Sequence, residues 1–136
     1  MSPSASLSVL EYQQLARFRR ALRAFLRFSD DAARAAGLTP AQHQLLLAIK
    51  GHVGPGAPSA SEVAEALQLR LHSTVELINR AEASGLLTRR ADPADGRRHL
   101  LSLTRDGEAR LTALSSLHRD ELRRLAEIVG VVGELR

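Results

Sequence analysis

Apolar residues recur at three- and four-residue steps through the first quarter of the chain. The positions that share this helical face are Leu15, Phe18, Leu22 and Phe25. Another face of the same stretch carries Arg19, Arg23 and Arg27. The spacing predicts one long amphipathic helix over residues 7–36, closed by Gly37. We interpret its arginines as a solvated face, and a crevice that holds an anionic ligand is the alternative.

A capping signature marks the start of a second helix. Thr39 supplies a hydroxyl N-cap, Pro40 a first-turn proline and Gln42 the reciprocal capping side chain. We expect this helix to end at Gly51, because residues 54–58 are rich in glycine and proline and therefore form a loop.

Two shorter helices are predicted next. Residues 60–67 carry an inward-facing apolar stripe, and residues 68–72 form a turn. Ser73 and Glu76 then have the spacing of a capping box, which predicts a further helix over residues 73–84. The stripe expected to be buried on this helix comprises Val75, Ile78 and Ala81. The result is a helix-turn-helix.

The sequence DPADGRRH at residues 92–99 lies between two short apolar stretches. Proline, aspartate and glycine favour a tight turn, so this segment predicts a β-hairpin with Arg97 and Arg98 at its tip. A helix followed by a basic hairpin is the arrangement of a winged helix-turn-helix. After the hairpin, Thr104 can cap one final long helix, with Asp106 near its positive end.

These elements predict a mainly α fold with a small β-hairpin wing. We expect the 136 residues to form a single domain. A winged helix-turn-helix lobe would occupy residues 38–104, flanked by helices at residues 7–36 and 105–134.

Composition narrows the function classes. The chain has no cysteine, which excludes disulfides, zinc-thiolate sites and thiol-based sensing. The first residues lack the apolar core of a signal peptide and no apolar run has the length of a membrane span, so we expect a cytoplasmic protein without a membrane partner.

The positive charge is concentrated at the predicted wing. The formal net charge is +4, and residues 86–105 hold five arginines against two acids. These arginines are Arg89, Arg90, Arg97, Arg98 and Arg105. A basic hairpin beside a helix-turn-helix favours contact with nucleic acid. Neighbouring strand residues face opposite ways, so we expect one of Arg89 and Arg90 to point toward phosphate and the other to pair with an acid.

No catalytic motif or cofactor signature is present, and the acids are scattered along exposed helix faces. We therefore predict no enzyme, no metal site and no cofactor. His52, His99 and His118 have no clustered partners in the sequence. His43 is interpreted as a half-buried histidine, with contact to an effector as the alternative.

The order of elements resembles the MarR family of bacterial transcription regulators, from residue 38 to about residue 111. The resemblance depends on residues 38–42 (LTPAQ), residues 62–64 (EVA) and the wing. The wing is the most specific part, because Asp95, Arg97, Leu103, Thr104 and Gly107 reproduce the family spacing D-x-R-x5-L-T-x-x-G.

The resemblance implies that the helix near His72 lies in the DNA major groove and that Arg97 enters the minor groove. The implied DNA contacts are Arg70, His72, Ser73, Thr74, Arg80, Arg89, Arg97 and Arg98. Asp95 would be structural and would hold the wing to the recognition helix through Arg80.

The resemblance further implies a homodimer formed by the first and last helices, which reads a pseudo-palindromic operator in double-stranded DNA. A small aromatic or phenolic anion would be the effector of this repressor. The candidate effector contacts are Tyr12, Arg19, Arg23 and His43.

The chain departs from the family pattern at several positions. Asn79 stands where an aspartate is usual and Ala81 where a leucine is usual. The region after Gly107 is shorter than is typical, so the last two helices are either merged into one or the last is clipped. The alternative function is an architectural DNA-binding protein, or a protein-interaction module, on the same fold.

Overall fold

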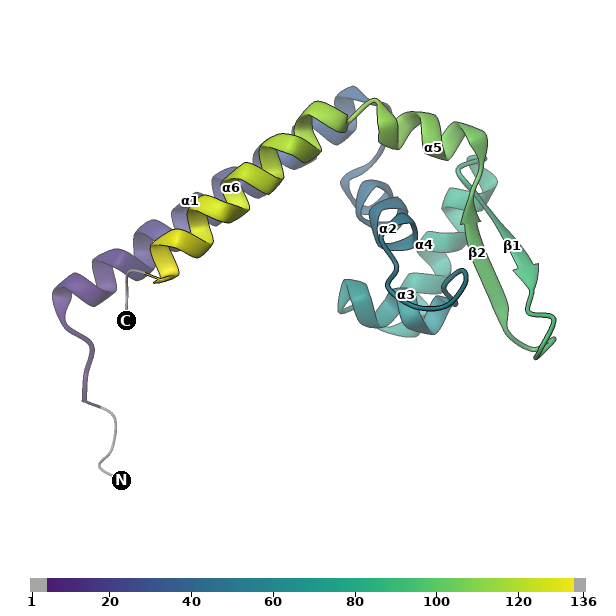
Figure 1. The fold of residues 1–136 in the computed structure, drawn as a ribbon, viewed down its shortest axis with the longest axis horizontal. Coiled ribbons are helices and arrows are strands. Elements are labelled where there is room, and N and C mark those ends of the chain that lie inside the picture. The colour runs from purple at the N-terminus through teal and green to yellow at the C-terminus, as the bar shows by residue number, and fades with distance from the viewer. Residues whose placement is uncertain (1–4, 134–136) are drawn as a thin grey trace.

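A long two-helix arm extends from a lobe that carries a β-hairpin (Figure 1). The computed structural model describes residues 5–133, with side chains through residue 128. Its elements are α1 (Val9–Ala35), α2 (Pro40–Lys50), α3 (Ala60–Leu67), α4 (Leu71–Ala83), β1 (Leu87–Ala91), β2 (His99–Leu103), α5 (Arg105–Thr112) and α6 (Ser115–Gly133). This confirms the predicted mainly α fold with a hairpin wing.

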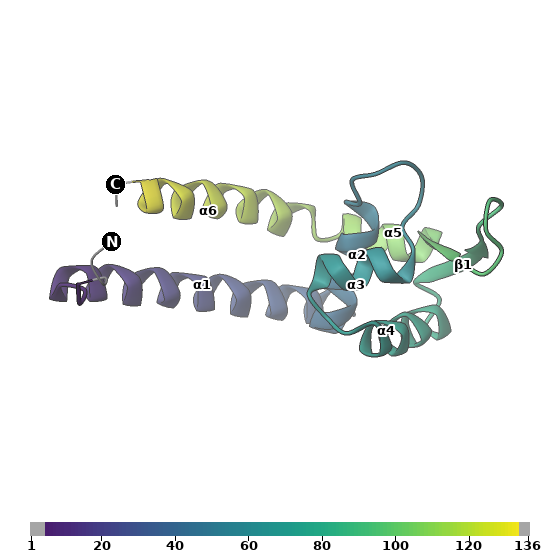
Figure 2. The ribbon, with the colours of Figure 1, turned by 90° about the horizontal axis from the view of Figure 1, so that it is seen from below.

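The arm consists of α1 and α6, which lie side by side in both views of the ribbon (Figures 1 and 2). Helix α1 begins at a capping box formed by Ser8 and Glu11. It ends before Gly37, whose φ of +80° favours glycine. Arg110 of α5 donates a hydrogen bond to the Gly37 carbonyl at 3.1 Å, so the end of α1 is fixed to the lobe.

The lobe core is built from aliphatic side chains of five elements, α2, α3, α4, β1 and β2. Helix α2 starts at the predicted Thr39 capping box, and the fully buried residues around it include Leu45, Leu46, Val63, Ile78, Leu87 and Leu101. The hairpin packs on this core through its inward-facing leucines, and the backbone amide of Leu101 also donates to Pro58 at 2.9 Å. The wing is therefore attached to the body of the lobe at its base.

Helix α4 begins two residues earlier than the sequence predicted. Its N-cap is Arg70, with no side-chain cap, and Ser73 therefore lies inside the first turn. Thr74 is fully buried, and its hydroxyl donates to the Arg70 carbonyl at 3.0 Å. The buried face is formed by Thr74, Ile78 and Ala81, and packing of this face overrides the local capping signal of Ser73 and Glu76.

The predicted single helix after the wing is also wrong. Thr104 does cap its start, because the Gly107 amide donates to the Thr104 hydroxyl at 3.0 Å. The chain then breaks between α5 and α6, where the Leu114 amide bonds to the Leu111 carbonyl in a tighter turn. Helix α5 packs on the lobe while α6 follows α1, so two helices are present and they are not merged. Residue 134 of the predicted range lies outside the described residues.

Gly107 is required by close packing against the backbone of Leu86, which lies between α4 and β1. It is buried, and a Cβ atom at this position would collide with the backbone oxygen of Leu86. We predict that Gly107→Ala lowers the free energy of unfolding by about 1–3 kcal/mol, the usual cost of overpacking. Urea denaturation measures this loss. Gly96→Ala is the control, because a Cβ there meets no atom within 4 Å. Equal stability of the two variants would contradict the packing argument.

Within the described residues, every helix is too short or too polar to cross a lipid bilayer.

Candidate nucleic-acid interface

The wing tip presents one arginine to solvent. Strands β1 and β2 pair antiparallel from Leu87 opposite Leu103 to Ala91 opposite His99. In the turn between them, the Asp95 carboxylate accepts a hydrogen bond from the Arg97 backbone amide at 3.1 Å. The side chain of Arg97 is 97% exposed. It is therefore available to a partner at the end of the hairpin.

Asp95 does not contact Arg80 as the sequence analysis expected. Its carboxylate shapes the turn locally, through the Arg97 amide and an ion pair of 3.8 Å with the Arg97 guanidinium. Asp95 is still structural, but it orders the wing tip and does not join the wing to the recognition helix.

The link between the wing and the recognition helix is made by Arg89. This side chain donates to Glu82 of α4 at 3.1 and 3.3 Å, and it also hydrogen-bonds Asn79. The expectation that one of Arg89 and Arg90 pairs with an acid is confirmed for Arg89. Its guanidinium is held by α4 in the free protein, and DNA contact by Arg89 stays a prediction. Arg90 is exposed.

A second link joins the wing to α3. Arg98 pairs with Glu62, and its Nε atom lies 3.8 Å from Asp92. Glu62 also accepts from the Ser59 amide at 3.1 Å and lies 3.3 Å from His52. The Ser59 amide lowers the pKa of the Glu62 carboxyl, and Arg98 and His52 act in the same direction, so Glu62 is held as an anion for the wing.

We predict that Glu62→Gln weakens operator binding about two- to fivefold, the range expected when a partly exposed ion pair is lost. Glutamine can still accept the Ser59 amide, so the start of α3 is retained and thermal stability changes little. Fluorescence anisotropy with labelled operator measures the effect. Glu65→Gln, on the exposed side of the same helix, is the matched control. Equal affinities of the two variants would show that the Arg98 pair does not position the wing.

The outer face of α4 holds most of the remaining predicted contacts. The exposed members are Arg70, His72, Ser73 and Arg80. Thr74 is removed from the predicted set because its side chain is buried and its hydroxyl is used within the helix. His72 lies 3.3 Å from Glu76, a pairing that sequence reasoning missed although the four-residue spacing could have revealed it.

The lobe is similar in sequence to a known protein family. A model of the MarR family matches residues 36–98, which span α2 to the wing turn. The winged helix-turn-helix lobe is therefore similar to the MarR family over these residues. No curated protein sequence matches the chain.

Solved structures are similar to this chain over the arm as well as the lobe. The MarR family transcription regulator SP03579 is 28% identical, with a TM-score of 0.70 over 86% of this chain and 74% of that chain. BpsR of Bordetella bronchiseptica is also 28% identical, with a TM-score of 0.68 over 91% of this chain and 96% of that chain. AbsC of Streptomyces coelicolor, 19% identical, shares the fold with a TM-score of 0.74 over 89% and 81% of the two chains.

His43 lies where α2 meets the arm. It is fully buried, not half-buried as predicted, and its ring stacks on His118 of α6 with centroids 5.4 Å apart. The two Nε2 atoms are 3.1 Å apart. The expectation that His118 lacks a partner is therefore wrong, and so is the same expectation for His52. Sequence spacing gave no signal for a pair separated by 75 positions.

The four candidate effector contacts do not converge within one chain. Tyr12 and Arg23 are eleven positions apart on one helix, which separates them by about 16 Å at 1.5 Å per residue. His43 is inaccessible, so it is withdrawn as an effector contact. Arg23 instead lines a groove on α1 with Arg20, Arg27 and Phe28.

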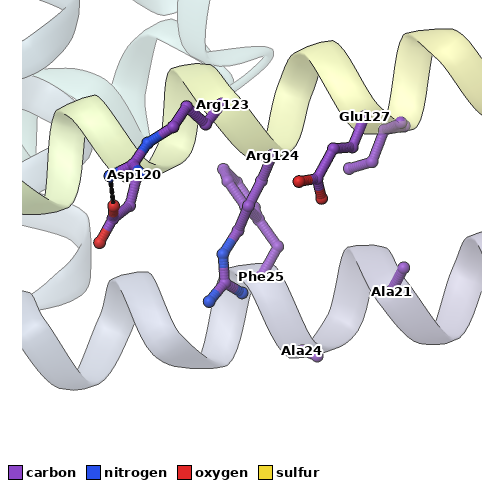
Figure 3. Close-up of a pocket in the computed structure, with 8 residues that line it drawn as sticks. Ala21, Ala24, Phe25, Asp120, Arg123, Arg124 and Glu127 are labelled. Carbon is purple, nitrogen blue, oxygen red and sulfur yellow. Dashed lines mark hydrogen bonds and ion pairs between the residues drawn. The ribbon is translucent and has the colours of Figure 1, made fainter.

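A neighbouring groove lies between α1 and α6 (Figure 3). Phe25 lines it from α1, and Arg124 reaches toward α1 from α6, whereas Arg123 pairs with Asp120 of its own helix. The guanidinium of Arg124 stands 5.0 Å from the centre of the Phe28 ring. Aromatic surface and cationic groups therefore occur together along the arm, a combination that suits flat anions.

Proposed function

We propose that this chain is a homodimeric, sequence-specific DNA-binding transcription regulator. The observation that carries the proposal is the position of Arg97, 97% exposed at the tip of a wing that is tied to the neighbouring recognition helix by Arg89. A narrow minor groove attracts an inserted arginine, and the exposed face of α4 supplies groups for the adjacent major groove.

Structural relatives support this proposal. CouR, a transcriptional repressor 24% identical to this chain, is solved on a 23-mer DNA duplex. MepR of S. aureus, 21% identical, is also solved as a DNA complex. At these identities the similarity concerns the fold alone. The proposal that this chain binds DNA therefore depends on its own exposed arginines.

The dimer is proposed from the arm. Leu15, Leu22 and Leu26 lie along one side of α1 and are 45%, 36% and 47% exposed. On α6, Leu122 and Leu125 are 69% and 53% exposed. A second arm laid against these leucines would bury them, as a symmetric dimer does with one self-complementary patch.

We further propose that the regulator is a repressor whose DNA binding responds to a small aromatic or phenolic anion. DNA binding by BpsR is regulated by 6-hydroxynicotinic acid, a compound of this class. In this chain the groove beside Phe28 offers Arg20, Arg23 and Arg27, which form no ion pair within the described residues. Arg19 lies outside this groove, and Tyr12 lies more than two helical turns away.

Binding to the protein's own upstream DNA tests the proposal. A fragment of that DNA and a scrambled fragment of equal length are compared at about physiological salt. A preference of roughly a thousandfold or more is expected of a specific regulator. Equal, steeply salt-dependent binding to both fragments would favour the architectural alternative, because phosphate contacts alone are blind to sequence.

A further inference from the structure

The histidine pair lies at the junction through which the lobe and the arm communicate. His43 belongs to α2 in the lobe, and His118 belongs to the first turn of α6, where the chain leaves the lobe and turns back along α1 (Figure 1). Leu114 and Leu117 beside His118 are buried, so α6 is packed firmly at this point. The two rings therefore join α2 of the lobe to the start of the arm helix α6.

The contact between the rings requires a particular protonation state. At 3.1 Å, one Nε2 atom must donate a hydrogen and the other must accept it. The pair can therefore carry no charge or one charge. A second proton places hydrogens on both facing nitrogens, and the hydrogen bond is replaced by repulsion between two cations. The Nδ1 atom of His43 is buried without a partner, so the ring gains no compensating bond by rotating.

The surroundings make the second proton unfavourable in the packed state. Burial lowers the pKa of His43 below its ordinary value, and His118 lowers it further. Glu121 of α6 and Asp30 of α1 act in the opposite direction. The remaining elements packed on α2 contribute no charged group that acts on His43 among the described residues.

We infer that the His43–His118 pair is a proton-sensitive latch between the lobe and the arm, which is closed at neutral pH and opened by acid. The inference rests on the proposed function, because the consequence of opening is a change in the separation of the two recognition helices of a dimer. Operator binding is then weakened as the pH falls.

The direction of the pH effect follows from the linkage between protonation of His43 and opening of the junction. His43 has a lowered pKa in the packed state and an ordinary one, near 6.5, once the junction opens. Stabilisation by the closed latch is complete above about pH 6.5 and is lost as the pH falls toward the lowered pKa of the packed state. His118 is half-buried, and a second proton on the pair opens the junction.

The free protein provides the first test. NMR of the imidazole nitrogens, recorded on the full chain between pH 8 and pH 5, is expected to show His43 titrating below its ordinary pKa. In His118→Gln, which removes one charge of the pair, His43 is expected to titrate at a higher pH than in the wild type. Independent titration of both rings near pH 6.5 would overturn the inference. This readout needs no DNA, so it fails or succeeds separately from the proposed function.

Binding provides the second test. Affinity for the preferred DNA fragment is expected to fall about tenfold between pH 7.5 and pH 5.5. In His118→Gln the loss is expected to be less than about threefold. His99→Gln, which removes an exposed histidine of the wing, is the matched control and keeps the wild-type loss. The same loss in His118→Gln as in the wild type would contradict the latch.

Discussion

Replacement of both Leu22 and Leu26 by glutamate is expected to convert the dimer into monomers and to lower operator affinity by about a hundredfold or more. The two leucines lie on the exposed apolar side of α1, and four carboxylates would face one another across a two-fold interface. Like charges forced together in an interface cost several kcal/mol. A monomer also reads only one half-site, so the affinity gained by joining two lobes is lost.

Sedimentation equilibrium of the double variant measures this effect, and circular dichroism shows whether the helices persist. Ala16→Glu adds a carboxylate to the arginine-bearing side of the same helix and is expected to remain dimeric. A double variant with the mass of a dimer would place the interface elsewhere. A wild-type protein with the mass of a monomer would remove the proposed dimer altogether.

The second large effect is expected at the wing tip. Arg97→Ala should weaken operator binding by about 1–3 kcal/mol, which is roughly five- to 150-fold. Thermal stability should be unchanged because the side chain is 97% exposed. Fluorescence anisotropy at fixed salt measures the affinity. Arg119→Ala, an equal change of charge on the exposed surface of the arm, controls for net charge. Wild-type affinity in Arg97→Ala would show that the wing tip does not enter the groove.

Much of the fold could be predicted from local signals. Glycines, prolines and hydroxyl caps mark where α1, α2 and α3 begin or end, and these signals act through neighbouring backbone atoms. The turn of the wing was predictable for the same reason, since Asp95 accepts a hydrogen bond from the backbone amide two positions later.

The errors occurred where long-range packing competes with local chemistry. Thr74 was predicted to face DNA, but its side chain belongs to the buried face of α4. Packing of this face extends the helix toward its N-terminus, so that it begins at Leu71. The break between α5 and α6 was missed because both helices continue the same leucine pattern. The two helices differ in what they pack against, since α5 contacts the lobe and α6 contacts α1. The partners of Arg89 were missed because the sequence does not show that Glu82 and Asn79 lie within its reach.

Footprinting on the preferred DNA fragment tests the central claim most directly. The claim is that two lobes of a dimer read one pseudo-palindrome. Hydroxyl-radical cleavage is expected to show two equal protected regions with centres about one helical turn, or a small multiple of it, apart. Arg97→Ala should lose protection only in the flanking minor grooves. A single protected region without two-fold symmetry, or uniform weak protection along the fragment, would contradict the account.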